Sequence, residues 1–208
     1  LTSSAQDTIL VEIYTDEGIV GYGETDTNPW VAKALIDSPG THTMDQSMKD
    51  ILIGKDPLSV EERWEELYVG TAMTGRRGAG VNAIGAIDMA LWDIKGKYFN
   101  APIYKLLGGS QKKIPSYAGG IALGWQDPVS LGEEALFHIA KGYNAIKLRV
   151  GDKIGEDFKR VTQVRKVIPE KIEVLVDANT NYTLKDAQKA LPFYEDHQIT
   201  WLEEPFPA

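Results

Sequence analysis

The fold is decided by residues 144–205, which contain three short apolar runs: NAIKLRV (144–150), IEVLVDAN (172–179) and ITWLEEP (199–205). A fourth β-prone run, 114–119, precedes them, and amphipathic segments with helical spacing lie between the runs. Alternation of strand and helix with short loops predicts a parallel sheet with helices packed outside it. Four such units make half of an eight-stranded barrel, and an open doubly wound sheet is the alternative.

Helix-start signals support this alternation. Asp127-Pro128 supplies an N-cap followed by proline at the first helical position, and Thr183 with Asp186 begins another helix. Residues 154–168 carry apolar side chains at helical spacing between two of the runs. No glycine fingerprint of the dinucleotide or P-loop type follows a strand here, which disfavours a nucleotide-binding sheet.

The first half of the chain has a different pattern. Residues 8–14 and 19–22 flank Asp16-Glu17-Gly18 and predict a β-hairpin, and residues 81–97 predict the longest helix. Possible capping boxes lie at Thr43 with Gln46 and at Ser59 with Glu62. Strands followed by helices indicate an α+β domain, so we predict two domains, residues 1–108 and 109–208.

Composition excludes several classes of function. The 208 residues carry 22 basic and 30 acidic side chains, a net charge of −8 that argues against bulk binding of nucleic acid or anionic membrane. Cysteine is absent, which excludes disulfides, zinc–thiolate sites and thiol nucleophiles. No apolar run approaches the length of a membrane span and no secretory leader is visible, so a cytoplasmic location is expected.

Charged residues stand near the carboxyl ends of the predicted strands. Lys147 and Arg149 are two residues apart and share one strand face, as do Asp177 and Asn179. In the last run, alternation does not choose between Glu203 and its neighbour. Taken singly, each would be a solvated residue at the rim. Together they fall at one edge, which in a barrel is where catalytic residues lie.

Two carboxylates at one buried edge need a cation between them, because burying unpaired charge costs several kcal/mol. Lys147 lies 30 residues before Asp177, which lies 26 before Glu203, close to one strand–helix unit each. Oxygen ligands of this kind suit Mg²⁺ or Mn²⁺. The nearby ammonium and guanidinium then call for an anion, and the carboxylate of a small-molecule substrate fits that role.

At these residues the chain resembles the enolase superfamily, in its mandelate racemase/muconate lactonizing branch. The likeness covers nearly the whole chain and rests on six motifs, whose order and spacing make it specific. They are Gly21-Tyr22-Gly23-Glu24, the helix segment AIDMALWD (86–93), residues 102–109, the Lys147-Leu148-Arg149 triplet in the place of the family's K-x-K, and the strands VDAN (176–179) and WLEEP (201–205).

The resemblance implies a capping domain and the first four strands of a modified TIM barrel. Asp177 and Glu203 would be Mg²⁺ ligands, with Glu204 a near neighbour at the substrate. Asn179 would lie beside the metal or substrate, and Lys147 would contact the substrate carboxylate. Trp30 ends the segment 25–30, which resembles the family's specificity loop, although a plain surface loop with a packed tryptophan is an equal alternative.

Arg149 departs from the family pattern, because it occupies the place of the base lysine. Arginine stays protonated far above neutral pH and is a poor base, but it clamps carboxylates well. This favours dehydration of a sugar acid to a 2-keto-3-deoxy acid through an enediolate, with the base elsewhere. A desolvated Lys147 with a lowered pKa is the second choice of base. His42, His138 and His197 lie away from strand ends, so they are expected to pack or face solvent.

Other activities remain open. A racemase, epimerase or cycloisomerase of the same superfamily is the alternative, and a non-catalytic or inactive fragment is the second. The resemblance also implies a homo-oligomer without nucleic-acid or membrane partners. The family's first capping strand, third metal ligand and His–Asp pair would lie outside residues 1–208. The chain is therefore expected to be truncated, poorly stable alone and inactive.

Overall fold

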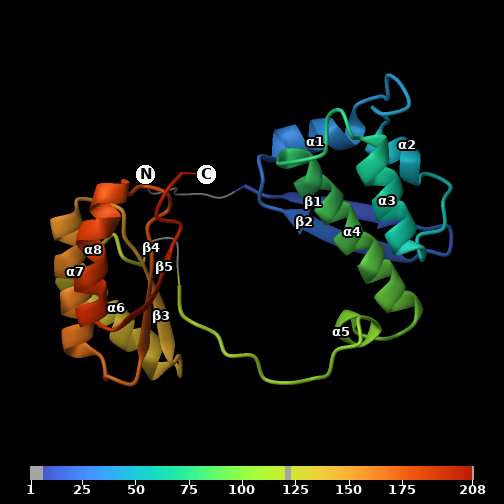
Figure 1. Cartoon of the computed structure of the whole chain (residues 1–208). Helices are drawn as coiled ribbons and strands as arrows, with labels where there is room; N and C mark the ends of the chain where they lie inside the picture. The colour runs from blue at the N-terminus through green and yellow to red at the C-terminus, as the bar shows by residue number, and fades with distance from the viewer. Residues whose placement is uncertain (1–6, 120–122, 208) are drawn as a thin grey trace. The chain divides into compact units, whose positions relative to one another are not determined.

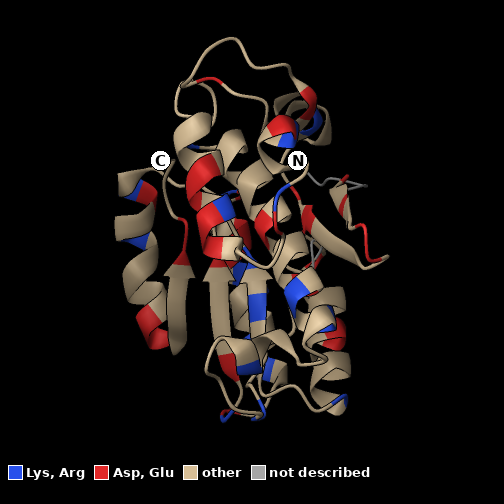
Figure 2. Ribbon diagram, turned by 90° about the vertical axis from the view of Figure 1, so that its right-hand side faces the viewer, with Lys and Arg blue, Asp and Glu red and all other residues tan. Residues whose placement is uncertain are grey.

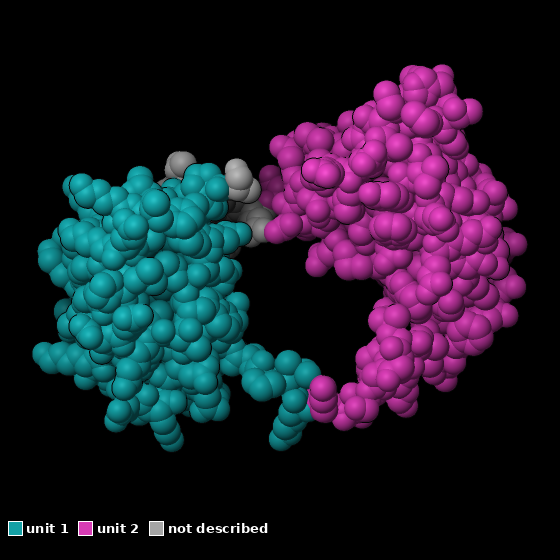
Figure 3. Space-filling view, in the orientation of Figure 1, with its two compact units in different colours: residues 1–3, 113–208 teal, residues 4–112 magenta. Residues whose placement is uncertain are grey.

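The computed structural model describes residues 7–119 and 123–207, which divide into two compact units on either side of residue 112 (Figure 3). We call residues 7–112 the N-terminal unit and residues 113–207 the C-terminal unit. Acidic and basic residues are interspersed along both (Figure 2). Within these ranges, none of the helices combines the length and the apolar character that crossing a membrane requires.

The N-terminal unit begins with the predicted hairpin. Strand β1 (Ile9–Tyr14) pairs antiparallel with β2 (Val20–Thr25), which extends three residues beyond the prediction. Thr15 and Ile19 close the turn through a backbone hydrogen bond of 3.0 Å, and Gly18 there has φ +79°. Inward-facing residues of β1 alternate with exposed ones, as expected for a sheet covered on one face.

Helix α4 (Ala79–Tyr98) is the longest of the described part and matches the predicted 81–97. Its predicted stripe is buried and consists of Ile84, Ile87, Leu91 and Ile94. The helix packs against β2 at two glycines. A Cβ on Gly23 would lie 1.9 Å from the Ala86 carbonyl oxygen, so the two backbones approach closely because β2 has no side chain there.

Four shorter helices complete the N-terminal unit, and here two capping predictions are wrong. They are α1 (Pro29–Asp37), α2 (Met48–Leu52), α3 (Val60–Gly70) and α5 (Ile103–Leu106). Helix α2 is capped by Ser47, whose hydroxyl accepts from Asp50 N at 3.2 Å, and not by Thr43. Ser59 does stand at the N-cap of α3, but its hydroxyl lies 3.4 Å from Asp56 instead of bonding the helix.

The C-terminal unit follows the predicted alternation. Its strands are β3 (Ala145–Arg149), β4 (Glu173–Asp177) and β5 (Ile199–Glu203), and its helices are α6 (Pro128–Ala140), α7 (Ile154–Val167) and α8 (Leu184–Asp196). Asp127 caps α6 by accepting from Val129 N and Ser130 N, and a complete capping box begins α8. Both helix starts were predicted, because short polar side chains at these positions satisfy the free N–H groups of a first turn.

The strand order decides between the two sheet architectures. The parallel order β3-β4-β5 follows the chain, and Ala118 forms an isolated parallel bridge on the other side of β3. Helices α6, α7 and α8 lie on the same side of these strands (Figure 1). A doubly wound sheet reverses its strand order and carries helices on both faces, whereas a barrel does neither. The α/β class is confirmed, and the arrangement is that of a barrel segment.

The core of the C-terminal unit lies between the sheet and these helices. Alternate strand residues Ile146, Leu148, Val174 and Val176 are buried there with side chains of all three helices. The opposite face of the sheet holds Lys147, Arg149 and Asp177, the residues that the alternation predicted would face away from the helices.

The strand predicted over 114–119 is not present in the described residues. Ala118 alone of this segment pairs with β3, accepting from Lys147 N at 2.8 Å and donating to Ala145 O at 2.9 Å. Pro115 has no N–H to donate, and residues 111–117 are exposed. A run of β-prone residues therefore lies beside the sheet without forming a regular ladder.

Candidate active site

The carboxyl ends of β3, β4 and β5 bring four charged residues to one edge of the sheet. Arg149 is the register partner of Asp177, and Asp177 is the register partner of Glu203. The β4–β5 pairing shifts by one residue between Val174 and Val176. Without that irregularity the continued register would place Leu202 opposite Asp177, so the shift is what aligns Glu203 with the buried aspartate.

Lys147 joins the two carboxylates. Its Nζ atom donates to Glu203 Oε1 at 2.9 Å and lies 3.1 Å from Asp177 Oδ2. The Asp177 side chain is 2% exposed and that of Glu203 is 35% exposed. The Asp177 carboxylate is therefore buried, whereas the Glu203 carboxylate is accessible to solvent.

Arg149 contacts the same Asp177 oxygen as Lys147. Its guanidinium donates to Asp177 Oδ2 and, at 2.8 Å, to Asn179 Oδ1. Asp177 Oδ1 in turn accepts from the Asn179 backbone N–H at 2.9 Å. The predicted pairing of Asp177 and Asn179 on one face is thus present, and Arg149 connects them.

The backbone beyond β4 and β5 adopts left-handed conformations. Asn179, Thr180 and Glu204 have φ values of 43°, 63° and 41°. Such angles are uncommon outside glycine, and a β-branched threonine there is an outlier. Thr180 N donates to Glu204 O at 2.7 Å, which ties the two segments together. Backbone strain of this kind clusters at functional sites.

The pKa of Lys147 depends on its burial and on the two neighbouring carboxylates. Burial lowers the pKa, but the hydrogen bonds and charges of Glu203 and Asp177 outweigh it, so the pKa of Lys147 is raised. The ammonium form is the one stabilised here. Lys147 therefore presents a cation, and not a free amine, to the edge of the sheet.

The donor set at this edge fits part of a magnesium site. Asp177 and Glu203 offer carboxylate oxygens, with the Asn179 amide oxygen nearby, and hard oxygen ligands are those that Mg²⁺ takes. The cation that now lies against both carboxylates is the Lys147 ammonium. Among residues 7–119 and 123–207, no group of three His, Cys, Asp or Glu side chains could hold a metal ion. A complete cage would need a further ligand.

Of the two other predicted substrate contacts, Glu204 lies in the C-terminal unit and Trp30 in the N-terminal unit. The Glu204 side chain is exposed, and this residue contributes its backbone carbonyl to the loop. Trp30 belongs to the N-terminal unit, where α1 begins at Pro29. It is 77% exposed, so the alternative of a packed tryptophan is wrong.

The three histidines lie outside the cluster, as predicted. His197 ends α8, stacks on Phe193 and lies 3.1 Å from the Thr162 hydroxyl. His138 lies 3.5 Å from a Glu134 carboxylate oxygen on α6. His42 is exposed and accepts from Met44 N at 3.3 Å. These contacts are local packing contacts within one element or between neighbours.

An aromatic pair beside Lys147 was missed by sequence reasoning. The Lys147 Nζ atom lies 5.5 Å from the centre of the Tyr117 ring, which packs edge-to-face on Trp201 at 6.1 Å. Alternation could have found Trp201, which lies two residues before Glu203 on β5. Tyr117 could not be found in this way, because its segment does not form the predicted strand.

Comparison with protein families and known proteins gives consistent matches along the chain. Residues 1–108 match the family model of the mandelate racemase/muconate lactonizing enzyme N-terminal domain. Residues 130–208 match the model described as enolase C-terminal domain-like.

Individual relatives extend these matches. Arabinonate dehydratase of Saccharolobus solfataricus is 35% identical over 99% of this chain and 54% of its own length. The crystal structure of an enolase-superfamily member from Polaromonas sp. JS666 superposes with a TM-score of 0.86 at 43% identity, covering 96% of this chain and 52% of that one. A racemase from Streptomyces coelicolor A3(2), solved with bound magnesium, gives a TM-score of 0.86 at 31% identity and covers 96% and 55%.

The curated relatives differ from one another in activity. They include sugar-acid dehydratases, cycloisomerases and racemases. This chain spans about half the length of the curated relatives it matches.

Proposed function

Because the chain belongs to the mandelate racemase/muconate lactonizing enzyme family of the enolase superfamily, we propose that it serves Mg²⁺-dependent removal of the proton α to a carboxylate. The observation that carries the proposal is the meeting of Lys147, Arg149, Asp177 and Glu203 at one edge of the sheet. In this proposal residues 1–108 form the capping domain, and residues 109–208 form the first part of the barrel, with the bridge at Ala118 in the place of its first strand.

The proposed roles follow from charge and exposure. Asp177 and Glu203 hold the metal, which supplies positive charge to a substrate carboxylate when bound. Lys147 and Arg149 orient that carboxylate from the same strand. Asn179, held by Arg149 and by its own N–H to Asp177, faces the substrate beside them. Glu204 and Trp30 are proposed as outer substrate contacts.

Arg149 favours dehydration among the reactions of the family. A guanidinium does not give up its proton near neutral pH, so it cannot accept the α-proton. A base on another part of the intact protein then removes that proton. The base returns a proton to the β-hydroxyl, which leaves as water, and the resulting enol tautomerises to a 2-keto-3-deoxy acid. The dehydratase named among the relatives supports a sugar acid as the substrate class.

Two other functions compete with this one. Racemisation, epimerisation or cycloisomerisation is supported by relatives with those names, and it needs the same proton abstraction. A chain that binds a carboxylate but does not turn it over is supported by Arg149 in the base position. The first differs from dehydration in the product formed, and the second forms no product.

A screen of the intact protein tests the proposal. Sugar acids are incubated with the protein and Mg²⁺, and keto-acid formation is scored by a colour reaction and by NMR. We expect a 2-keto-3-deoxy acid from at least one substrate. Epimerised or cyclised products alone would replace dehydration by the first alternative, and binding without any product would support the second.

Lys147→Met is expected to tighten Mg²⁺ binding to the intact, substrate-free protein by about tenfold. The ammonium lies against both carboxylates that are proposed to hold the metal, and its removal frees their oxygens. Isothermal titration calorimetry with magnesium chloride measures the change in Kd.

Lys159→Met is the matched control, because it removes an ammonium that pairs with Glu156 on the exposed side of α7. Its Kd should equal that of the parent protein. An unchanged Kd in Lys147→Met would mean that the metal does not share oxygens with Lys147.

A further inference from the structure

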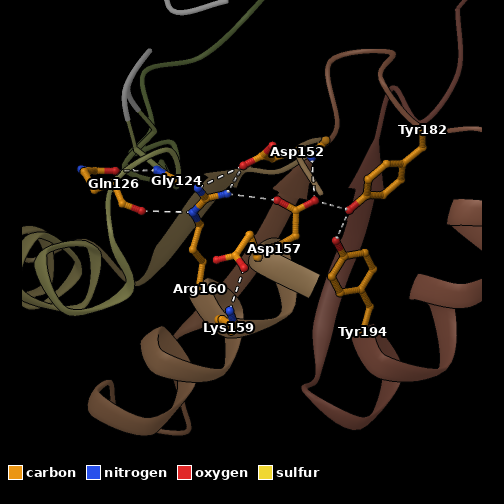
Figure 4. A network of polar contacts seen from close by, with 10 residues as sticks. Gly124, Gln126, Asp152, Asp157, Lys159, Arg160, Tyr182 and Tyr194 are labelled. Atoms are coloured by element: carbon orange, nitrogen blue, oxygen red, sulfur yellow. Dashed lines mark hydrogen bonds and ion pairs between the residues drawn. The ribbon is translucent and has the colours of Figure 1, made fainter. Parts of the chain in front are cut away.

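The C-terminal unit contains a fully buried carboxylate that lies outside the candidate active site. Asp157, in the first turn of α7, has no exposed surface. Its Oδ2 atom accepts from the Gly151 backbone N–H and from the Tyr182 hydroxyl, each at 3.0 Å. Figure 4 shows Asp157 between Tyr182 on one side and Arg160 on the other. The carboxylate therefore joins the segment after β3 to the segment after β4.

The hydrogen-bond direction through the two buried tyrosines can be assigned. Tyr182 has one hydroxyl proton and donates it to Asp157, so at the 2.7 Å contact with Tyr194 it must accept. Burial raises the pKa of both tyrosines, which keeps these protons in place. Tyr194 therefore donates to the Tyr182 hydroxyl, and Tyr182 stands between it and Asp157.

Arg160 extends the connection to a third segment. Its Nη1 atom lies 3.4 Å from Asp157 Oδ1 and 3.3 Å from Asp152 Oδ2, and its Nε donates to the Gln126 carbonyl at 3.0 Å. The Gln126 side chain accepts from Gly124 N at 3.0 Å (Figure 4). Burial raises the pKa of Asp157, while its hydrogen bonds and the charge of Arg160 oppose the rise.

These three segments carry the backbone of the candidate active site. Arg149 N donates to Leu123 O at 2.7 Å, and Val150 N donates to Asp177 O at 2.9 Å. Gly151 approaches β4 so closely that a Cβ would lie 2.4 Å from the Ala178 carbonyl oxygen. From β4 onward, the N–H groups of residues 178, 180 and 182 donate to carbonyls of residues 203, 204 and 205.

We propose that Asp157 and Arg160 are positioning residues, an ion pair on α7 with a buried carboxylate, and that they set the distances between the strand ends carrying Arg149, Asp177 and Glu203. The pair touches none of these side chains and acts through Gly151, Tyr182 and Gln126. The backbone beyond β4 has positive φ angles that non-glycine residues rarely adopt. Contacts with surrounding residues must therefore stabilise this conformation. The expected effect of this pair on Mg²⁺ binding rests on the proposed function, whereas its expected effect on the backbone conformation does not.

Tyr182→Phe tests the proposal with Tyr194→Phe as its matched control. Each change deletes one hydroxyl from a tyrosine that is 3% exposed, but only the first breaks a bond to Asp157. Amide hydrogen exchange in the metal-free intact protein is the readout. In Tyr182→Phe we expect exchange of the Thr180 and Tyr182 amides to rise about tenfold relative to α6 amides, and in Tyr194→Phe we expect no such local change.

Calorimetry with magnesium chloride supplies the second readout. Tyr182→Phe and Asp157→Asn are expected to weaken Mg²⁺ binding about tenfold, and Tyr194→Phe to leave it unchanged. If amide exchange rose equally across the whole C-terminal unit in both tyrosine variants, the proposal would be overturned. The hydrogen bonds would then stabilise the unit as a whole and would not position the ends of its strands. If the parent protein binds no Mg²⁺ while the local exchange difference is present, the proposed function fails and the positioning role stands.

Discussion

Asp177→Asn is expected to weaken Mg²⁺ binding by the intact protein more than about 100-fold and to abolish its turnover. Asp177 is the most buried member of the proposed metal pair and contacts Lys147 and Arg149 at once. Its replacement by a neutral amide removes a carboxylate oxygen from the proposed metal pair and leaves Lys147 and Arg149 without the negative charge that both contact. Titration calorimetry measures the Kd, and a thermal melt checks that the fold is kept.

Adjacent glutamates provide the matched comparison for this site. Glu203→Gln should weaken Mg²⁺ binding as strongly as the aspartate change, because Glu203 is the register partner of Asp177. Glu204→Gln removes an exposed carboxylate one residue further on and should change Kd less than about threefold. Equal losses in the two glutamate variants would contradict the assignment of Glu203 as the ligand.

Gly23→Ala is expected to destabilise the N-terminal unit by about 3–5 kcal/mol. The added Cβ would lie 1.9 Å from the Ala86 carbonyl oxygen and 2.9 Å from Ala90 N, both backbone atoms of α4. The helix cannot yield by rotating a side chain, so β2 and α4 must separate. Urea unfolding followed by circular dichroism measures the loss, and hydrogen exchange of α4 amides assigns it to this unit.

Gly85→Ala is the control on the facing helix. A Cβ at Gly85 meets nothing within 4 Å, and alanine is favoured over glycine inside a helix. The stability should therefore rise by about 0.5–1 kcal/mol. If Gly85→Ala lost as much stability as Gly23→Ala, any methyl group added at this helix would be destabilising. The close approach of β2 and α4 would then not be the cause of the loss in Gly23→Ala.

Local signals explain which elements could be predicted. Asp127-Pro128 and the Thr183–Asp186 box begin helices in the structure because each satisfies free N–H groups within its own turn. The capping box predicted at Thr43 is wrong, because α2 begins after Ser47, next to the apolar residues that this helix buries. The strand expected over 114–119 failed because a ladder depends on partners from elsewhere in the chain.

Site residues were predicted to the extent that they follow from alternation along one strand. Lys147 and Arg149 share a face because successive side chains of a strand point in opposite directions. Asn179 lies beyond β4 in a left-handed conformation, and it meets Asp177 through its own N–H and through Arg149. Asp157 was missed, since a single acid in the first turn of a helix has the pattern of a solvated residue. Its burial depends on Tyr182 and Gly151, which arrive from other segments.

The amino-acid sequence alone determined the α/β class, the sheet edge that gathers charge, and the arginine that is unsuited to act as a base. These properties depend on residue type and on spacing within single elements. Tertiary structure alone decided that Glu203 and not Glu204 stands opposite Asp177, because a shift in pairing between β4 and β5 sets that register. It also decided that Lys147 is held as a cation, since its pKa depends on two carboxylates from neighbouring strands.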